Sequence, residues 1–221
     1  VCGYYEIVDE KKRLVKKSEE QDTVLDHMLR IMNWLLDKTD PRTGCIRVLF
    51  GDWNDALDGL GTSRDPDKEY GSGVSVMAAS QVWQNLNEMI SLLNADKYSD
   101  TITDYSERAD RLAAGLQKYG IVYNDEGQAR ISHGWGDELS YHVGGWNDPD
   151  GVARRSLTSN AFWVLSGLYD RDTGLRGVIE KDILALDSKY GLRTFEPHFE
   201  PDAKGVGRIP KLPAGTAENG A

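Results

Sequence analysis

The sequence of 221 residues has little cysteine, little histidine and no long apolar run. Two cysteines, Cys2 and Cys45, are too few for a disulfide scaffold or a cysteine-built metal site, so free thiols are expected. Hydrophobic residues make up 39% of the chain, but no run approaches the roughly 18 residues of a membrane span. The sequence therefore predicts no membrane partner.

Cations are also scarce, and they are scattered rather than clustered. There are 26 Lys and Arg against 36 Asp and Glu, which gives a formal net charge of −10. Because nucleic acids are bound by clustered cations, this balance argues against a nucleic-acid partner. No metal site is predicted either, since the four histidines, at 27, 133, 142 and 198, include no pair four residues apart.

The ends of the chain indicate that it is a piece of something longer. It begins with Val1 rather than methionine and finishes in a loop-like run of small and polar residues, 213–221. We expect a chain truncated at both ends, so the missing signal peptide says little about location. Its length allows one sizeable core or two small ones.

Five segments carry apolar residues at three- and four-residue spacings, and each predicts a helix. These segments are 23–38, 72–93, 100–119, 156–169 and 175–189. Residues 121–131 predict one short β-hairpin around a turn at Gly127. The predicted fold class is all-α, with helical hairpins arranged as in a partial α/α barrel; a smaller bundle is the alternative.

Three long polar loops, 47–73, 132–155 and 190–221, separate the predicted helices. Loops of this length on a rigid scaffold commonly carry function. The first holds the most informative stretch, residues 51–59, in which Asp52, Asp55 and Asp58 fall within seven residues beside Trp53 and Asn54. Unpaired and buried, these acids would cost several kcal/mol, so the segment must be solvated, bind a cation or face a polar ligand.

An indole beside a carboxylate suits a sugar, because its flat face stacks on the ring while acid and amide groups reach hydroxyls. Glycosidic cleavage needs a proton for the leaving oxygen. A hydrolase also needs a carboxylate to activate water, here Asp52, Glu138 or Glu218. Phosphate, in contrast, arrives as an anion and needs no protein base. The alternative is that the segment has no function and is an acidic surface turn with a half-buried Trp53.

A second cluster, residues 134–151, places Trp135 and Trp146 among Gly, Asp and Asn residues. It could supply aromatic walls for a sugar, or form only a surface turn. His133 and His142 flank part of it and suit sugar or phosphate contacts or a structural role. Residues 156–164 put small polar side chains at a helix start, where exposed amides could bind an anion or merely cap the helix.

These observations leave a third interpretation open. A non-catalytic carbohydrate-binding helical domain would use Trp53, Trp135 and Trp146 as stacking platforms.

Motifs in three places together resemble the inverting β-glycoside phosphorylases. They are the Asp-Trp-Asn-Asp motif of residues 52–55, the Tyr-Gly-Leu of residues 190–192 and the Gly-Thr-Ala-Glu-Asn-Gly of residues 215–220. The family (glycoside hydrolase family 94-like) includes cellobiose, chitobiose, laminaribiose and β-1,3-glucan phosphorylases. Residues 156–163 and the loops between 134 and 151 look more like the β-1,3-glucan enzymes. The resemblance extends over most of the chain.

The resemblance implies that residues 1–221 are part of a single (α/α)6-barrel catalytic domain. The implied reaction is the reversible phosphorolysis of a β-glucoside to α-glucose 1-phosphate with inversion. Asp55 would be the general acid, and Asp52, Trp53, Asn54 and Glu218 would lie at the substrate. Inorganic phosphate is the implied co-substrate, with no metal or organic cofactor.

Other family residues that bind phosphate are expected mostly beyond Ala221, so the isolated fragment should be inactive. The expected partners are an oligosaccharide or disaccharide and phosphate. A homodimer and association with the remainder of the enzyme both stay open. We expect a cytoplasmic location, because the reaction needs phosphate and must retain a sugar phosphate.

Overall fold

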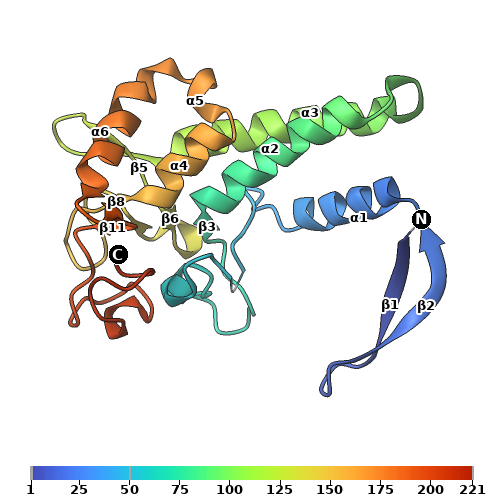
Figure 1. Ribbon diagram of the computed structural model, residues 1–221, viewed down its shortest axis with the longest axis horizontal. Coiled ribbons are helices and arrows are strands. Elements are labelled where there is room, and N and C mark those ends of the chain that lie inside the picture. The colour runs from blue at the N-terminus through green and yellow to red at the C-terminus, as the bar shows by residue number, and fades with distance from the viewer. Residues whose placement is uncertain (1, 50, 221) are drawn as a thin grey trace. The chain divides into compact units, whose positions relative to one another are not determined.

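The computed structural model describes residues 2–49 and 51–220, which form two compact units divided after Lys38. The first unit holds an antiparallel hairpin, β1 (Cys2–Asp9) and β2 (Leu14–Asp22), followed by α1 (Val24–Leu36) (Figure 1). Thr23 caps α1 through its hydroxyl, and Asp26 returns a bond to the Thr23 amide. This reciprocal capping explains why the helix starts where it does.

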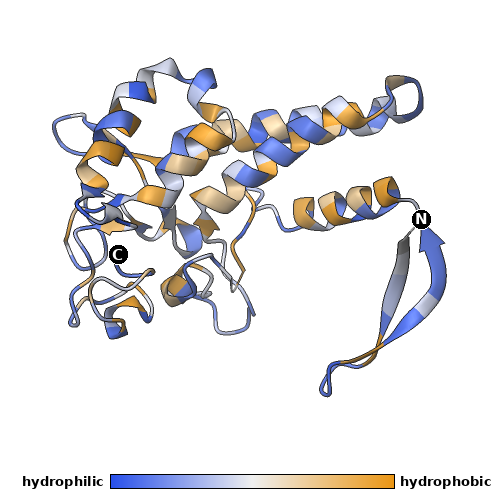
Figure 2. Cartoon of the chain, in the orientation of Figure 1, coloured by the Kyte–Doolittle hydropathy of each residue, from blue (hydrophilic) through white to orange (hydrophobic). Residues whose placement is uncertain are grey.

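The hairpin was not among the predicted elements, because neither of its strands alternates cleanly between apolar and polar residues. Tyr5, Ile7 and Val15 are all more than half exposed. The Tyr4 hydroxyl donates to Asp22 at the end of β2 at 2.6 Å, and its ring joins the hairpin to α1, 4.2 Å from the ring of His27. In α1 itself, hydrophobic and hydrophilic bands alternate along the helix (Figure 2).

The second unit contains most of the helices. α2 (Val76–Leu92) and α3 (Ala95–Gly115) lie side by side, and α4 (Leu157–Leu165), α5 (Leu168–Arg171) and α6 (Arg176–Leu186) follow (Figure 1). A π-helical turn, Leu116–Gly120, closes α3. Its described residues also form four short 3-10 helices, η1 (Asp55–Leu60), η3 (Asp137–Leu139), η4 (Thr173–Leu175) and η5 (Ile209–Lys211).

Short strands tie the loops of this unit together. β3 (Val74–Ser75), β6 (Gly134–Trp135) and β7 (His142–Val143) form one three-stranded sheet. The remaining strands pair antiparallel in twos: β4 (Ile121–Tyr123) with β5 (Ala129–Ile131), β8 (Arg155–Ser156) with β11 (Phe195–Glu196), and β9 (Asp187–Ser188) with β10 (Gly191–Leu192).

The predicted all-α class is therefore wrong. The chain is 44% helical with 18% strand, a mixed content. The predicted hairpin at 121–131 is present as β4 and β5, but most other strands in the second unit are only two residues long. Strands of that length carry no alternation that a sequence pattern can reveal. The expectation of one domain over residues 1–221 stays a prediction.

The helix predictions are confirmed in position but not in every boundary. The helix expected from residue 72 starts at Val76, because Val74 and Ser75 pair with β6 instead. Gly73 allows this, since a Cβ there would lie 1.8 Å from the carbonyl oxygen of Leu60. The helix expected over 156–169 is broken by Gly167, whose φ is 90°.

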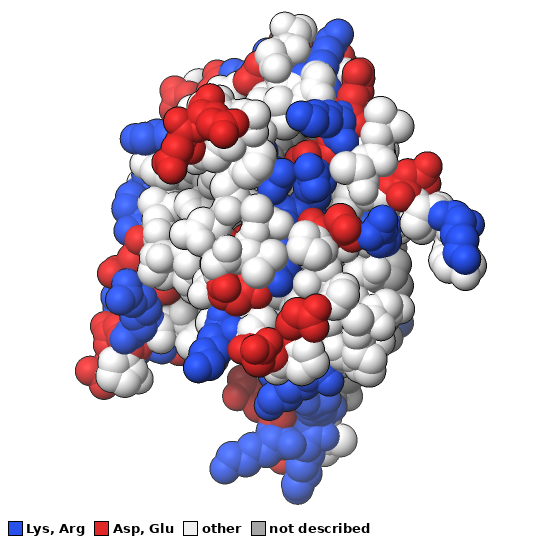
Figure 3. Space-filling view, turned by 90° about the vertical axis from the view of Figure 1, so that its left-hand side faces the viewer, with Lys and Arg blue, Asp and Glu red and all other residues white. Residues whose placement is uncertain are grey.

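Acidic and basic side chains are interspersed over the face shown in Figure 3. Among the described residues, no helix is long and apolar enough to cross a membrane. Within the second unit, Cys45 is a free thiol, and burial raises its pKa to about 12.

Candidate active site

The Asp-Trp-Asn-Asp motif (residues 52–55) runs into η1, and its first three side chains are each held by a different part of the chain. The Asp52 carboxylate is 2% exposed. One oxygen accepts from the Ser75 hydroxyl at 2.8 Å, and the other contacts Nε2 of His133. Ser75 and His133 lie in β3 and just before β6, so the three-stranded sheet holds Asp52.

The pairing with His133 determines the ionisation of Asp52. Burial alone would raise the pKa of Asp52. The charge of His133, together with hydrogen bonds from His133, Ser75 and the Trp53 amide, outweighs burial and lowers that pKa below its ordinary value. Asp52 is consequently an anion at neutral pH and has no proton to deliver.

Trp53 and Asn54 are attached to two more segments. The indole Nε1 of Trp53 donates to the Thr158 hydroxyl, 3.1 Å away in the first turn of α4. Asn54 is fully buried; its amide nitrogen donates to the backbone carbonyl of Glu218 at 2.9 Å, and its amide oxygen accepts from the backbone of Ala56 at 3.2 Å. Asn54 thus caps η1 and joins the motif to the C-terminal loop.

Asp55 differs from the three residues before it, because it is exposed. Its carboxylate makes no hydrogen bond or ion pair with residues 2–49 or 51–220. Its backbone carbonyl accepts from the Arg208 guanidinium at 2.9 Å, and the same guanidinium donates to Asp58 at 2.6 Å. The motif therefore presents one free carboxylate on a segment that is fixed on both sides.

The C-terminal loop that receives Asn54 is itself pinned by Asn219. This buried amide accepts from the Phe199 backbone at 2.7 Å and donates to the carbonyls of Phe199 and Leu212 at 3.0 and 2.9 Å. The neighbouring Glu218 is partly exposed, and within the described part of the chain its carboxylate has no hydrogen-bonding or ionic partner. Two unpaired carboxylates, Asp55 and Glu218, are thus carried by segments that Asn54 joins.

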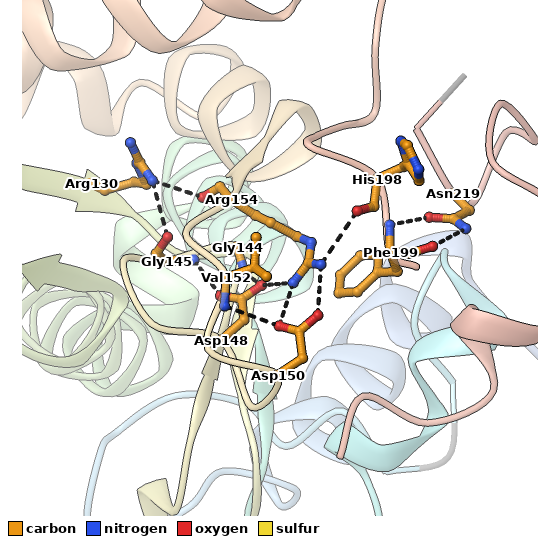
Figure 4. Close-up of polar contacts among 10 residues, drawn as sticks. All are labelled: Arg130, Gly144, Gly145, Asp148, Asp150, Val152, Arg154, His198, Phe199 and Asn219. Atoms are coloured by element: carbon orange, nitrogen blue, oxygen red, sulfur yellow. Dashed lines mark hydrogen bonds and ion pairs between the residues drawn. The ribbon is translucent and has the colours of Figure 1, made fainter. Parts of the chain in front are cut away.

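The buried Arg154 contacts the same C-terminal loop at His198 and Phe199 (Figure 4). Arg154 is 1% exposed; it donates to both carboxylate oxygens of Asp150 at 2.7 Å and to the His198 carbonyl at 3.3 Å. Its guanidinium lies 3.9 Å from the centre of the Phe199 ring. Asp148, bonded by the amides of residues 144 and 145, faces the same guanidinium at 3.4 Å.

The other predicted candidates lie apart from this arrangement. Trp135 is completely buried, so it offers no sugar platform. Trp146 is covered by Arg130, whose guanidinium lies 3.7 Å from the ring centre beside a cavity of about 370 Å³ that none of residues 52–55 lines. Nε2 of His142 donates to the Tyr119 carbonyl at 3.0 Å, and the Glu138 backbone amide donates to the Ser72 hydroxyl at 2.8 Å.

Sequence reasoning did not identify Ser75, Arg154 or Arg208 as parts of the site. Ser75 and Ser156 share a signal, a serine directly before an apolar helix start. Nothing in the local sequence separates the buried Arg154 or the bridging Arg208 from other arginines, because Arg154 is buried by distant residues such as Phe199 and Arg208 bonds the distant Asp55 and Asp58.

Comparison with known proteins places the chain in a family. Residues 2–221 match the catalytic domain of the glycosyl hydrolase 94 superfamily. The chain therefore belongs to this family, as the Asp-Trp-Asn-Asp and Glu-Asn-Gly motifs predict.

Three curated relatives are phosphorylases. An N,N'-diacetylchitobiose phosphorylase from Vibrio proteolyticus is 27% identical over 90% of this chain and 22% of its own length. A solabiose phosphorylase from Paenibacillus borealis is 26% identical over 91% and 24%. A cellobionic acid phosphorylase from Neurospora crassa is 26% identical over 99% and 25%. The chain thus spans about a quarter of the length of the relatives that it matches.

Proposed function

We propose that these residues belong to an inverting phosphorylase that cleaves a β-gluco-oligosaccharide or a cellobiose-type disaccharide with inorganic phosphate. The observation that carries the proposal is the position of Asp55. Three successive side chains, Asp52, Trp53 and Asn54, are anchored to three segments, and the next one is an exposed carboxylate without a partner in the described chain. The names of the curated relatives support the same reaction class.

In the proposed reaction, Asp55 donates its proton to the glycosidic oxygen as the bond from that oxygen to the anomeric carbon breaks. A phosphate oxygen forms the new bond on the opposite face, which inverts the configuration. The products are α-glucose 1-phosphate and an acceptor shortened by one sugar. Trp53 lines the sugar site, Asp52 and Asn54 hold the segment, and Glu218 contacts the substrate.

Phosphate is the only co-substrate required, and its binding residues lie mostly in the parent enzyme outside this chain. We place the reaction in the cytoplasm, where phosphate is supplied and a sugar phosphate is retained. An inverting hydrolase is the second candidate, because Glu218 offers a free carboxylate that could activate water. Asp52 does not suit that role, since it is buried against His133.

The deciding experiment incubates the complete enzyme with β-linked gluco-oligosaccharides, with and without phosphate. Release of glucose 1-phosphate only when phosphate is present supports phosphorolysis, whereas phosphate-independent release of free glucose supports the hydrolase. Asp55→Asn should lower turnover by at least about a thousandfold while sugar binding persists. Asp125→Asn, in the exposed turn between β4 and β5, is the matched control.

A further inference from the structure

His133 lies at the centre of a continuous series of hydrogen bonds behind the proposed site. Its Nε2 contacts Asp52, and its Nδ1 lies 3.1 Å from the Ser156 hydroxyl and 3.4 Å from the Thr158 hydroxyl. The two hydroxyls are 3.3 Å apart, and Thr158 accepts from the Trp53 indole at 3.1 Å. The imidazole therefore connects the carboxylate of Asp52 to the indole of the adjacent residue.

Donor and acceptor chemistry fixes the two ends of this series. An indole N–H only donates, so Thr158 accepts from Trp53 and has its own proton to pass on. An ionised carboxylate only accepts, so Nε2 of His133 carries a proton toward Asp52. Nδ1 accepts from Ser156 when it carries no proton and donates to the hydroxyls when the imidazole is charged, so the series links Trp53 to Asp52 in either state.

The connection Asp52–His133–Ser156 follows the order of a serine-hydrolase triad, but its burial excludes the nucleophilic role that the serine has in such a triad. His133 and Ser156 are both 0% exposed, and the His133 ring packs 5.2 Å from the ring of Phe195. No substrate carbonyl can reach a hydroxyl in that position, and a nucleophilic serine must be reachable. The series instead holds two neighbouring side chains of the motif.

We propose that His133 is a positioning residue with two separable tasks, an inference that rests on the proposed phosphorolysis. Its Nε2 side holds Asp52 and so sets the segment that presents Asp55. Its Nδ1 side holds Thr158 and so sets the plane of the Trp53 indole against the sugar. The first task acts on proton delivery and the second on sugar binding, so each should appear in a different kinetic constant.

Two substitutions separate the tasks, because the amide of glutamine occupies the place of Nε2 and that of asparagine the place of Nδ1. His133→Gln keeps the bond to Asp52 and loses the hydroxyls, so KM for the sugar should rise about tenfold while kcat stays within about threefold. His133→Asn keeps the hydroxyls and releases Asp52, so kcat should fall about a hundredfold with a smaller change in KM.

His142→Gln and His142→Asn are the matched controls. His142 lies in the same three-stranded sheet, is largely buried and bonds a backbone carbonyl, but it contacts none of residues 52–55 in the described chain. Equal changes in kcat and KM in both His133 variants, or the same changes in the His142 variants, would overturn the two-task assignment.

A spectroscopic readout keeps the inference separate from the proposed function. The complete enzyme is labelled with 5-fluorotryptophan, and the Trp53 fluorine signal is assigned with Trp53→Phe. His133→Gln should shift this signal, and His142→Gln should not. If the wild-type enzyme shows no phosphorolysis, the proposed function fails, and the Trp53 signal alone then decides on the hydrogen-bond series. If neither His133 variant folds, Ser156→Ala, which does not contact Trp53, must shift the signal; an unmoved signal overturns the proposal.

Discussion

The side-chain amide of Asn54 donates to the backbone carbonyl of Glu218 across 164 positions of sequence, at 2.9 Å. This bond joins the two segments that carry the carboxylates of Asp55 and Glu218, neither of which has a partner in the described part of the chain. Because Asn54 is completely buried, the bond is shielded from competing water. The relative placement of the proposed proton donor and the proposed substrate contact therefore depends in part on this amide.

Asn54→Ser should separate the two roles of that amide. Serine still caps η1 but cannot reach Glu218, whereas Asn54→Ala loses the cap as well, at a further cost of about 1 kcal/mol. We expect Asn54→Ser to raise KM for the sugar about tenfold, as measured by steady-state kinetics. The exposed Asn87→Ser on α2 is the control, and wild-type kinetics in Asn54→Ser would show that Glu218 needs no tether.

Arg208 should matter more for activity than for stability. Its ion pair with Asp58 is largely solvated, with 60% of the arginine side chain exposed, and such pairs contribute less than about 1 kcal/mol. The same guanidinium also holds the backbone of Asp55. Arg208→Ala should lower kcat about tenfold with little change in thermal unfolding, since small displacements of a catalytic group are costly.

Arg171→Ala, which breaks another exposed pair with Asp110, is the comparison for Arg208. Both variants should unfold at nearly the temperature of the wild type, and only Arg208→Ala should lose turnover. A large loss of stability in Arg208→Ala, or an unchanged kcat, would contradict this prediction.

The contribution of Asp52 to stability should depend on pH with a defined sign. The folded state lowers the pKa of Asp52, although burial opposes this, so its ionisation stabilises the fold above the unfolded value of about 3.9. That stabilisation is lost as the pH falls through the folded pKa. Urea unfolding should show a gap between wild type and Asp52→Asn that is full above about pH 5 and closes in stronger acid.

Asp182 is a control, because the fold shifts its pKa in the direction opposite to that of Asp52. Burial raises its pKa in spite of the neighbouring Arg130 and Arg155, so its contribution is lost as the pH rises through the folded pKa. The gap between wild type and Asp182→Asn should therefore shrink with rising pH. If the unfolding free energies of the two variants changed with pH in the same way, the opposite pKa shifts of Asp52 and Asp182 would be excluded.

Arg154 should be among the most sensitive positions for folding. Replacing it with methionine leaves Asp148 and Asp150 without their buried cation, and breaking a buried pair in this way costs about 3–5 kcal/mol. Arg176 makes a similar contact with an aspartate and an aromatic ring, but its side chain is 42% exposed. Arg176→Met should cost less than about 1 kcal/mol in urea unfolding, and equal losses would refute a special role for the buried cluster.

The spacing of apolar residues was sufficient to predict the helices but not most of the strands. The apolar spacing of α1, α2 and α3 is a local property, so their existence is predictable, as is the hairpin of β4 and β5. Strands such as Val74–Ser75 exist only because a distant strand pairs with them. The all-α prediction failed for that reason, and the first hairpin, with both faces largely exposed, also lacks a local signal.

The sequence by itself determined the composition of the motif at residues 52–55, its order with the later Glu-Asn-Gly and hence the family. It could not rank the three acids of that segment, because ionisation and access depend on burial. Only the tertiary structure decided that Asp52 is enclosed by Ser75 and His133 while Asp55 stays exposed, with no partner among the described residues. The physical reason is that the groups that bury and bind a side chain come from strands and loops far away in sequence.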